Sequence, residues 1–133
     1  MTSFIDKLAW VYLVDRRVLC ARSRGKDTYY LPGGKREGAE TDQEALSREV
    51  REELGIELIP ETITYFGQFS AQAHGKAEGT VVQMTCYTGQ FRGEIQALAE
   101  VEEVAWLQYK DKTKVSQVTQ QIFEHLKEQG LLA

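Results

Sequence analysis

Residues 34–56 of this chain read GKREGAETDQEALSREVREELGI, and the fold is decided by this stretch. Glu49, Glu52 and Glu53 stand at positions i, i+3 and i+4, so a helix places their carboxylates side by side on neighbouring turns. Carboxylates held this close repel one another unless a cation neutralises them, and hard divalent ions prefer carboxylate oxygens. The spacing therefore predicts a site for a divalent metal ion.

The same stretch contains the signals for where this helix begins and ends. Thr41, followed three residues later by Glu44, forms a capping box, and Gly55 is a typical C-terminal stop. We therefore expect a helix over residues 42–54. Its buried side is a row that repeats every four residues: Leu46, Val50 and Leu54. Because two of the glutamates lie beside this row and not opposite it, the helix should direct them into a cleft.

The composition predicts one compact domain over residues 1–133, with 42% hydrophobic residues to form its core. A net charge of −4 argues against binding to long nucleic acid, which requires a basic stripe. No apolar run approaches the roughly 20 residues of a membrane span, and the N-terminus lacks signal-peptide features, so we expect a cytoplasmic protein without a membrane partner. Cys20 and Cys86 lie in apolar, strand-like runs and are expected to be reduced core residues.

Other segments show the residue patterns of strands, rich in β-branched, aromatic and alternating apolar residues: 8–14, 18–22, 28–31, 63–69 and 80–88. The polar, glycine-containing segment 70–79 is expected to be a hairpin loop. Near the C-terminus, residues with helical spacing precede a glycine stop: Val115, Val118, Ile122, Leu126 and then Gly130. The order of strands, helix, strands and helix indicates an α/β layered domain.

The quoted stretch also fits a longer pattern, G-x5-E-x7-R-E-U-x-E-E-x-G-U with U aliphatic, at every position. It thereby resembles the Nudix box, the signature of hydrolases that cleave nucleoside diphosphates linked to a further group X. The whole chain is similar in size and layout to a minimal, MutT-like Nudix domain. This resemblance implies an α/β/α sandwich around a mixed central β-sheet, a topology that periodicity alone does not specify.

The resemblance implies roles for the residues that match the box. Glu49, Glu52 and Glu53 would bind Mg2+ or Mn2+, and one of them would act as the general base; which one varies within the family. The backbone carbonyl of Gly33 would be a further metal ligand, because paired glycines allow a close approach. A solvated acidic helix surface is the structural alternative.

Two charged groups near the box have both a supporting and a catalytic interpretation. Arg48 and Glu40 are expected to form a pair that fixes the loop on the helix and orients the acids, with direct phosphate contact by Arg48 as the alternative. Glu100, Glu102 and Glu103 lie in a segment similar to the family's acidic loop ahead of an aromatic strand, and one of them would supply a further metal ligand or the base, with Glu103 as the first choice. A solvated turn is the alternative for that loop.

Basic and aromatic residues close to the box are candidate substrate contacts. Arg22 and Lys35 would neutralise phosphates, and Tyr30 would stack on a base, against the alternatives of surface bases and a core aromatic. His74, in the 70–79 loop, is a weaker candidate for a substrate contact.

These features predict a metal-dependent hydrolase that cleaves a phosphoanhydride bond in a nucleotide-type small molecule. A nucleoside triphosphate pyrophosphohydrolase, with oxidised or noncanonical triphosphates among its substrates, is the first interpretation. Sugar nucleotides, ADP-ribose, dinucleotides and the 5′ cap of RNA are alternative substrates. A non-catalytic Nudix module that senses a nucleotide is the alternative of another class, disfavoured because every box glutamate is present. The protein is expected to be a monomer or a homodimer.

Overall fold

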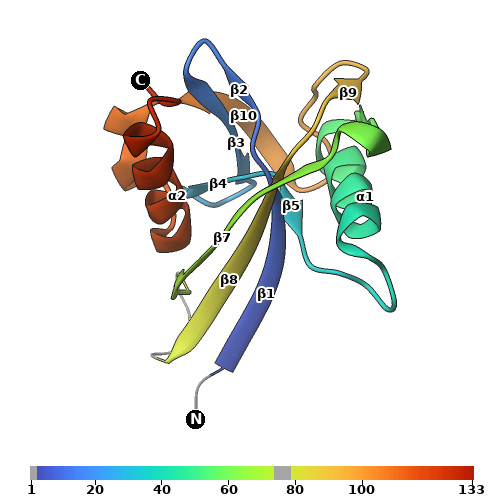
Figure 1. The fold of residues 1–133 in the computed structure, drawn as a ribbon, viewed down its shortest axis with the longest axis horizontal. Helices are drawn as coiled ribbons and strands as arrows, with labels where there is room; N and C mark the ends of the chain where they lie inside the picture. Colours follow the sequence, from blue (N-terminus) through green and yellow to red (C-terminus); the bar gives the residue numbers. More distant parts are fainter. Residues whose placement is uncertain (1–2, 74–78) are drawn as a thin grey trace.

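A four-stranded mixed sheet forms the centre of the fold. The computed structural model describes residues 3–73 and 79–133 (Figure 1). The strand order is β5-β1-β8-β7, with bounds Gly33–Gly34, Ser3–Trp10, Thr80–Thr88 and Thr64–Gln72. β1 and β8 are parallel, whereas the β1–β5 and β7–β8 pairs are antiparallel. The sheet is therefore mixed, as the resemblance implies.

A second sheet lies beside the first and has the order β10-β3-β2, with bounds Val101–Leu107, Arg17–Ser23 and Leu13–Val14. The short strand β4 (Tyr29–Tyr30) also pairs with β3. A separate two-stranded pair joins β6 (Glu57–Leu58) to β9 (Phe91–Arg92). Two 3-10 helices complete the connections: η1 (Pro60–Thr62) and η2 (Tyr109–Lys114).

The two α-helices, α1 (Asp42–Leu54) and α2 (Gln117–Glu128), lie on opposite sides of the strands (Figure 1). Alternate residues of β1 pack into the cores on the two sides of the sheet, because successive side chains of a strand point to opposite faces. Leu8 and Trp10 belong to the core under α1, whereas Ala9 and Val11 belong to the core under α2. The result is the expected α/β/α sandwich.

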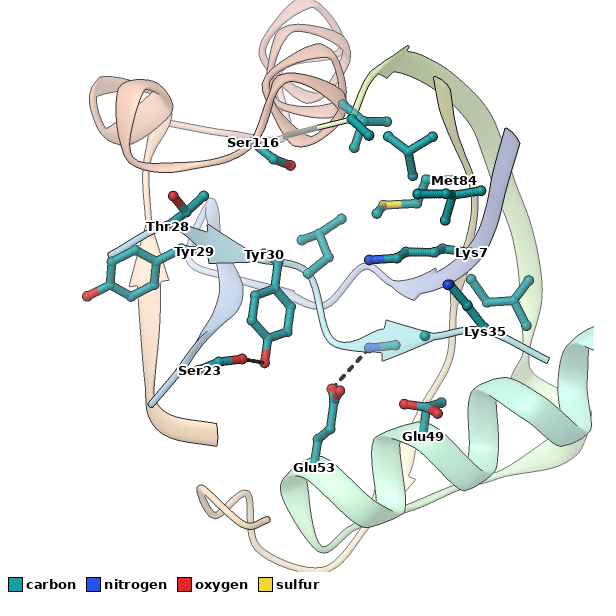
Figure 2. A pocket seen from close by; sticks show the side chains of 18 of the residues that line it. Lys7, Ser23, Thr28, Tyr29, Tyr30, Lys35, Glu49, Glu53, Met84 and Ser116 are labelled. Carbon is teal, nitrogen blue, oxygen red and sulfur yellow. Dashed lines mark hydrogen bonds between the residues drawn. The ribbon is translucent and has the colours of Figure 1, made fainter. Parts of the chain in front are cut away.

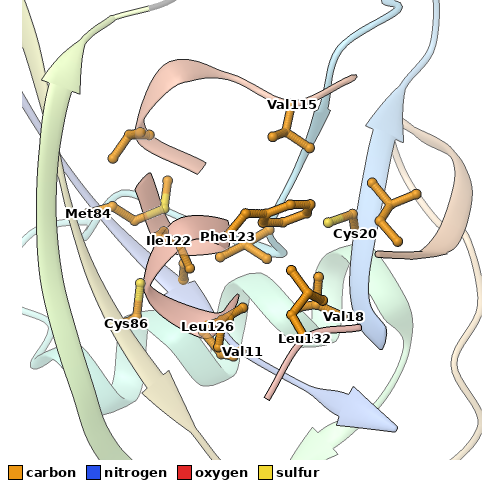
Figure 3. Packing of buried hydrophobic residues seen from close by; sticks show 14 of the residues in the cluster. Val11, Val18, Cys20, Met84, Cys86, Val115, Ile122, Phe123, Leu126 and Leu132 are labelled. Atoms are coloured by element: carbon orange, nitrogen blue, oxygen red, sulfur yellow. The ribbon is translucent and has the colours of Figure 1, made fainter. Parts of the chain in front are cut away.

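Figure 3 shows the core under α2, where Phe123 and Ile122 pack against residues of both sheets. Cys20 and Cys86 are buried in this core as free thiols, as predicted. Burial raises the pKa of the Cys86 thiol to about 12 and that of Cys20 still further. In the described part of the chain, no helix is long and apolar enough to cross a membrane.

The prediction for α1 is confirmed at both ends. The Thr41 side chain accepts a hydrogen bond from the Glu44 backbone, the Glu44 carboxylate accepts one from the Thr41 N–H, and Gly55 ends the helix at a φ of 72°. The predicted row of apolar residues is fully buried: Leu46, Val50 and Leu54. These signals are local in sequence, and they therefore sufficed to predict the bounds and the buried side of the helix.

Several predicted strand bounds are wrong. The strand expected over 8–14 begins already at Ser3 and is interrupted after Trp10, because the Val11 N–H donates to Tyr87 while the Tyr12 carbonyl accepts from β3. β7 continues to Gln72, so pairing with β8 replaces the first part of the loop expected over 70–79. Val115 is buried but lies outside the helix predicted for it: it is the C-cap residue that follows η2 and precedes α2.

The prediction of an acidic loop around Glu103 is also wrong. Glu102 and Glu103 lie within β10, whose residues pair with β3. A shift in register between Val101 and Glu103 disrupts the alternation that would have marked the strand in the sequence.

Candidate active site

The glycine pair of β5 lies directly against both β1 and the helix. A Cβ atom on Gly33 would come within 2.0 Å of the Leu8 carbonyl oxygen, and its φ of 146° favours glycine. A Cβ atom on Gly34 would come within 2.5 Å of the Glu49 carboxylate. The absence of side chains here brings the backbone of the turn into contact with the glutamates of α1.

Glu53 is the most buried carboxylate of the helix, with 5% of the residue exposed. Its Oε1 accepts a hydrogen bond from the Gly33 N–H at 3.1 Å. Burial, supported by the negative charge of Glu49 and Glu100, raises the pKa of Glu53 to about 8. A cation bound beside this carboxylate would stabilise its ionised form.

Arg48 links the helix to the loop that follows β5. Its guanidinium donates to Glu40 at 2.7 and 2.9 Å, to Glu49 at 2.7 Å and to the Lys35 carbonyl at 3.0 Å. The hydrogen bonds from Arg48 are the main reason that the pKa of Glu40 falls to about 2. This geometry matches the supporting interpretation, in which Arg48 holds the loop and orients Glu49.

Glu52 differs from the other two helix glutamates because its side chain is 54% exposed and it does not line the pocket described below. Within residues 3–73 and 79–133, no group of three or more histidine, cysteine, aspartate or glutamate side chains forms a ready-made metal cluster. Glu49 and Glu53 nevertheless both lie against β5 and line one pocket. Their oxygen donors fit Mg2+ or Mn2+, because Mg2+ takes one or two carboxylates and keeps several waters.

A pocket of about 770 Å³ lies in front of these carboxylates (Figure 2). Glu49 and Glu53 form one end of it, and Met84 and Ser116 lie at the opposite end. Tyr30 and Lys35, two of the candidate substrate contacts, line it, and the Tyr30 hydroxyl shares a hydrogen bond of 3.0 Å with Ser23. The lining also includes apolar side chains that belong to the core under α2 or pack against it: Ile5, Leu31, Ala73, Val82 and Val118.

Arg22 and Glu103 bind each other and do not line this pocket. Arg22 Nε donates to Glu103 at 2.8 Å, and the Tyr29 hydroxyl donates to the same carboxylate at 2.6 Å. These hydrogen bonds, that from Tyr29 first, lower the pKa of Glu103. Arg22 also donates to the Lys26 carbonyl at 2.8 Å, so the pair fixes the loop between β3 and β4.

From the sequence, Lys7 was not identified as a site residue, and Glu103 was preferred to Glu100 as the further acid of the site. Glu100, just before β10, lines the pocket where Glu103 does not. Lys7 lines it from the middle of β1. The available signal for Lys7 was its position between Ile5 and Ala9 on one face of a strand, where a charge interrupts an apolar pattern. His74 lies outside the described residues.

Comparison with known proteins agrees with this geometry. A family model described as NUDIX domain matches residues 6–126. The solution structure of the Escherichia coli ORF135 protein is similar, with 25% identity, a TM-score of 0.71, and coverage of 95% of this chain and 92% of that one. The MutT protein from Methanosarcina mazei has the same fold, with 19% identity, a TM-score of 0.75, and coverage of 97% and 96%.

A human protein named 8-oxo-dGDP phosphatase NUDT18 is 46% identical over 43 residues. That match spans 32% of this chain and only 13% of the human protein. The family match, by contrast, extends over most of the chain and includes the glycine turn, the glutamate helix and every pocket residue except Ile5. The chain therefore belongs to the NUDIX family, whose members hydrolyse nucleoside diphosphate derivatives.

Proposed function

We propose that this Nudix hydrolase cleaves a phosphoanhydride bond of nucleoside triphosphates, oxidised or noncanonical ones included, with Mg2+ or Mn2+ as cofactor. The observation that carries the proposal is the polarity of the pocket, with carboxylates at one end and an apolar wall at the other. A nucleotide has the matching asymmetry, because its phosphates are charged and its base is flat and largely apolar.

In this proposal, Glu49, Glu53 and the Gly33 carbonyl hold the metal, and the exposed Glu52 adds a carboxylate from the rim. The ion would neutralise the phosphates and lower the pKa of the attacking water. One of these three glutamates would accept the proton from that water. Arg48 keeps Glu49 in position through its hydrogen bond of 2.7 Å.

The substrate contacts follow from the lining of the pocket. Lys35 contributes a positive charge beside the glycine turn, and Tyr30 offers an aromatic ring. Glu100 is the better candidate for an additional carboxylate, because Glu103 is engaged by Arg22 and Tyr29. We assign Arg22 and Glu103 to holding the loop between β3 and β4.

Hydrolysis of an oxidised nucleoside diphosphate is a second candidate function. It is favoured by the segment that is 46% identical to the human 8-oxo-dGDP phosphatase. The two candidates differ in whether a diphosphate or a triphosphate is the better substrate. A direct comparison of kcat/KM for matched pairs, such as 8-oxo-dGDP and 8-oxo-dGTP, distinguishes them.

The test is a product screen with Mg2+ or Mn2+ over ordinary and oxidised nucleotides, sugar nucleotides, ADP-ribose, dinucleotides and capped RNA. We expect Glu53→Gln to lower kcat/KM about 10²-fold or more, as for other single electrostatic losses in active sites. Glu128→Gln, at the exposed end of α2, is the matched control and should leave the rate unchanged. Tight nucleotide binding without any product would instead identify a sensor module.

A further inference from the structure

Lys7 lies between Ile5 and Ala9 on the face of β1 that is directed toward the core under α2. Ile5 and Ala9, the neighbours on the same face, belong to the core under α2 or pack against it. The Lys7 side chain is half-buried and lines the pocket, with its amino group directed into the cavity (Figure 2). A charge in such a row conflicts with the pattern of the strand, and such conflicts concentrate at functional sites.

The register of the sheet places Lys7 between the two ends of the pocket. On one side, the Cα partner of Lys7 is Met84 of β8, which belongs to the apolar end. On the other side, the next residue, Leu8, pairs with Gly34, against which Glu49 lies. Lys7 is thus one residue away from the glycine turn and directly beside the apolar wall.

At this position, Lys7 would lie beside one particular group of a bound nucleotide, the phosphate attached to the nucleoside. With the base against the apolar wall and the bond to be cleaved beside Glu49 and Glu53, the phosphate that carries the nucleoside comes between them. A lysine amino group donates hydrogen bonds and accepts none, so it matches a phosphate oxygen. Lys35 lies closer to the glycine turn and suits the phosphates farther from the nucleoside.

Resting on the proposed function, we propose that Lys7 binds the phosphate attached to the nucleoside and thereby fixes the direction in which the substrate lies. The apolar end of the pocket would receive the base through contacts that do not distinguish charge. Lys7 would then be responsible for much of the affinity for a nucleoside monophosphate but for little of the affinity for the nucleoside.

The experiment measures binding of the four deoxynucleoside monophosphates and the four matching nucleosides by NMR titration, in EDTA to exclude metal ions. The variants are Lys7→Met, which keeps the length of the side chain, and Lys7→Arg, which keeps the charge. Lys110→Met, exposed on η2, is the control for loss of a positive charge elsewhere.

We expect Lys7→Met to weaken monophosphate binding about 10- to 100-fold, the range for losing one charge-assisted hydrogen bond. Nucleoside binding should change by less than about twofold, and Lys7→Arg should recover most of the monophosphate affinity. Equal weakening of nucleosides and monophosphates, or no change for either, would overturn the assignment, as would a wild-type protein that binds no monophosphate. A melting temperature for each variant reveals any general loss of folding.

The outcome is separable from that of the hydrolysis screen. If no nucleotide is cleaved but monophosphate binding depends on Lys7, the proposed function fails and this inference holds. If nucleotides are cleaved but Lys7→Met binds monophosphates like wild type, the inference fails and the proposed function holds.

Discussion

Gly34→Ala is the substitution that most directly connects the geometry of the site to its activity. The new Cβ would lie 2.5 Å from Glu49 Oε2, whereas ordinary contact begins at 3.4 Å, so the carboxylate must move by about 0.9 Å. The φ of Gly34 is not in the region that disfavours alanine, so the backbone can remain in place. The perturbation therefore falls on the position of one side chain.

A displacement of about 1 Å at a reacting centre costs on the order of 10²-fold in rate, and we expect that loss in kcat/KM for Gly34→Ala. Weakening the 2.7 Å hydrogen bond between Arg48 and Glu49 should cost only about 1 kcal/mol of stability. The assay is steady-state kinetics with Mg2+ on the best substrate of the screen, together with denaturant unfolding.

Two other glycines provide comparisons. At Gly89 the nearest atom to an added Cβ is 3.4 Å away, so Gly89→Ala should retain wild-type activity. At Gly33 the added Cβ would meet the backbone of β1, so Gly33→Ala should unfold the site or the protein. Unchanged kcat/KM in folded Gly34→Ala would refute the placement of Glu49 in the active site.

Substitutions of Arg22, which does not line the pocket, and of Glu53, which does, test these two placements. Because Arg22 binds Glu103 outside the pocket, we expect Arg22→Met to lower kcat/KM by less than about tenfold in steady-state kinetics. A loss as large as that of Glu53→Gln would show that Arg22 contacts the substrate after all. The pKa of Glu53, about 8 without metal, lies above its unfolded value, so the stability from its protonated form is present at low pH and lost as pH rises toward 8. We therefore expect the free energy of unfolding of the wild type to decrease between pH 5 and pH 8. The decrease, measured by urea titration in EDTA, should be larger than that of Glu53→Gln by on the order of a few kcal/mol. Parallel pH profiles for the two proteins would contradict a buried, protonated Glu53.

The helix and the supporting pair around it could be predicted from the sequence because their determinants are close together. The capping residues, the apolar row and Gly55 all lie within or next to one helix. Glu40 and Arg48 are only eight residues apart and do pair in the structure. Local signals of this kind do not depend on how distant strands align.

The residues that line the rest of the pocket depend on sheet register, which the sequence does not state. Glu103 and Arg22 are 81 residues apart, and their mutual bond removes both from the pocket while Glu100 remains in it. Lys7 enters the site because β1 pairs with β8 on one side and β5 on the other. The sequence predicted strands 80–88 and 18–22 well, but not which side chains they would bring together.

In the proposed mechanism, Glu49 and Glu53 hold a divalent cation against the phosphates of a nucleotide. The most direct measurement is an EPR titration of Mn2+ in the presence of a non-hydrolysable nucleoside triphosphate, with wild type and the double variant Glu49→Gln/Glu53→Gln. We predict protein-bound Mn2+ in wild type and its loss in the double variant. Equal Mn2+ binding by the two proteins, with both folded, would contradict the assignment of Glu49 and Glu53 as metal ligands.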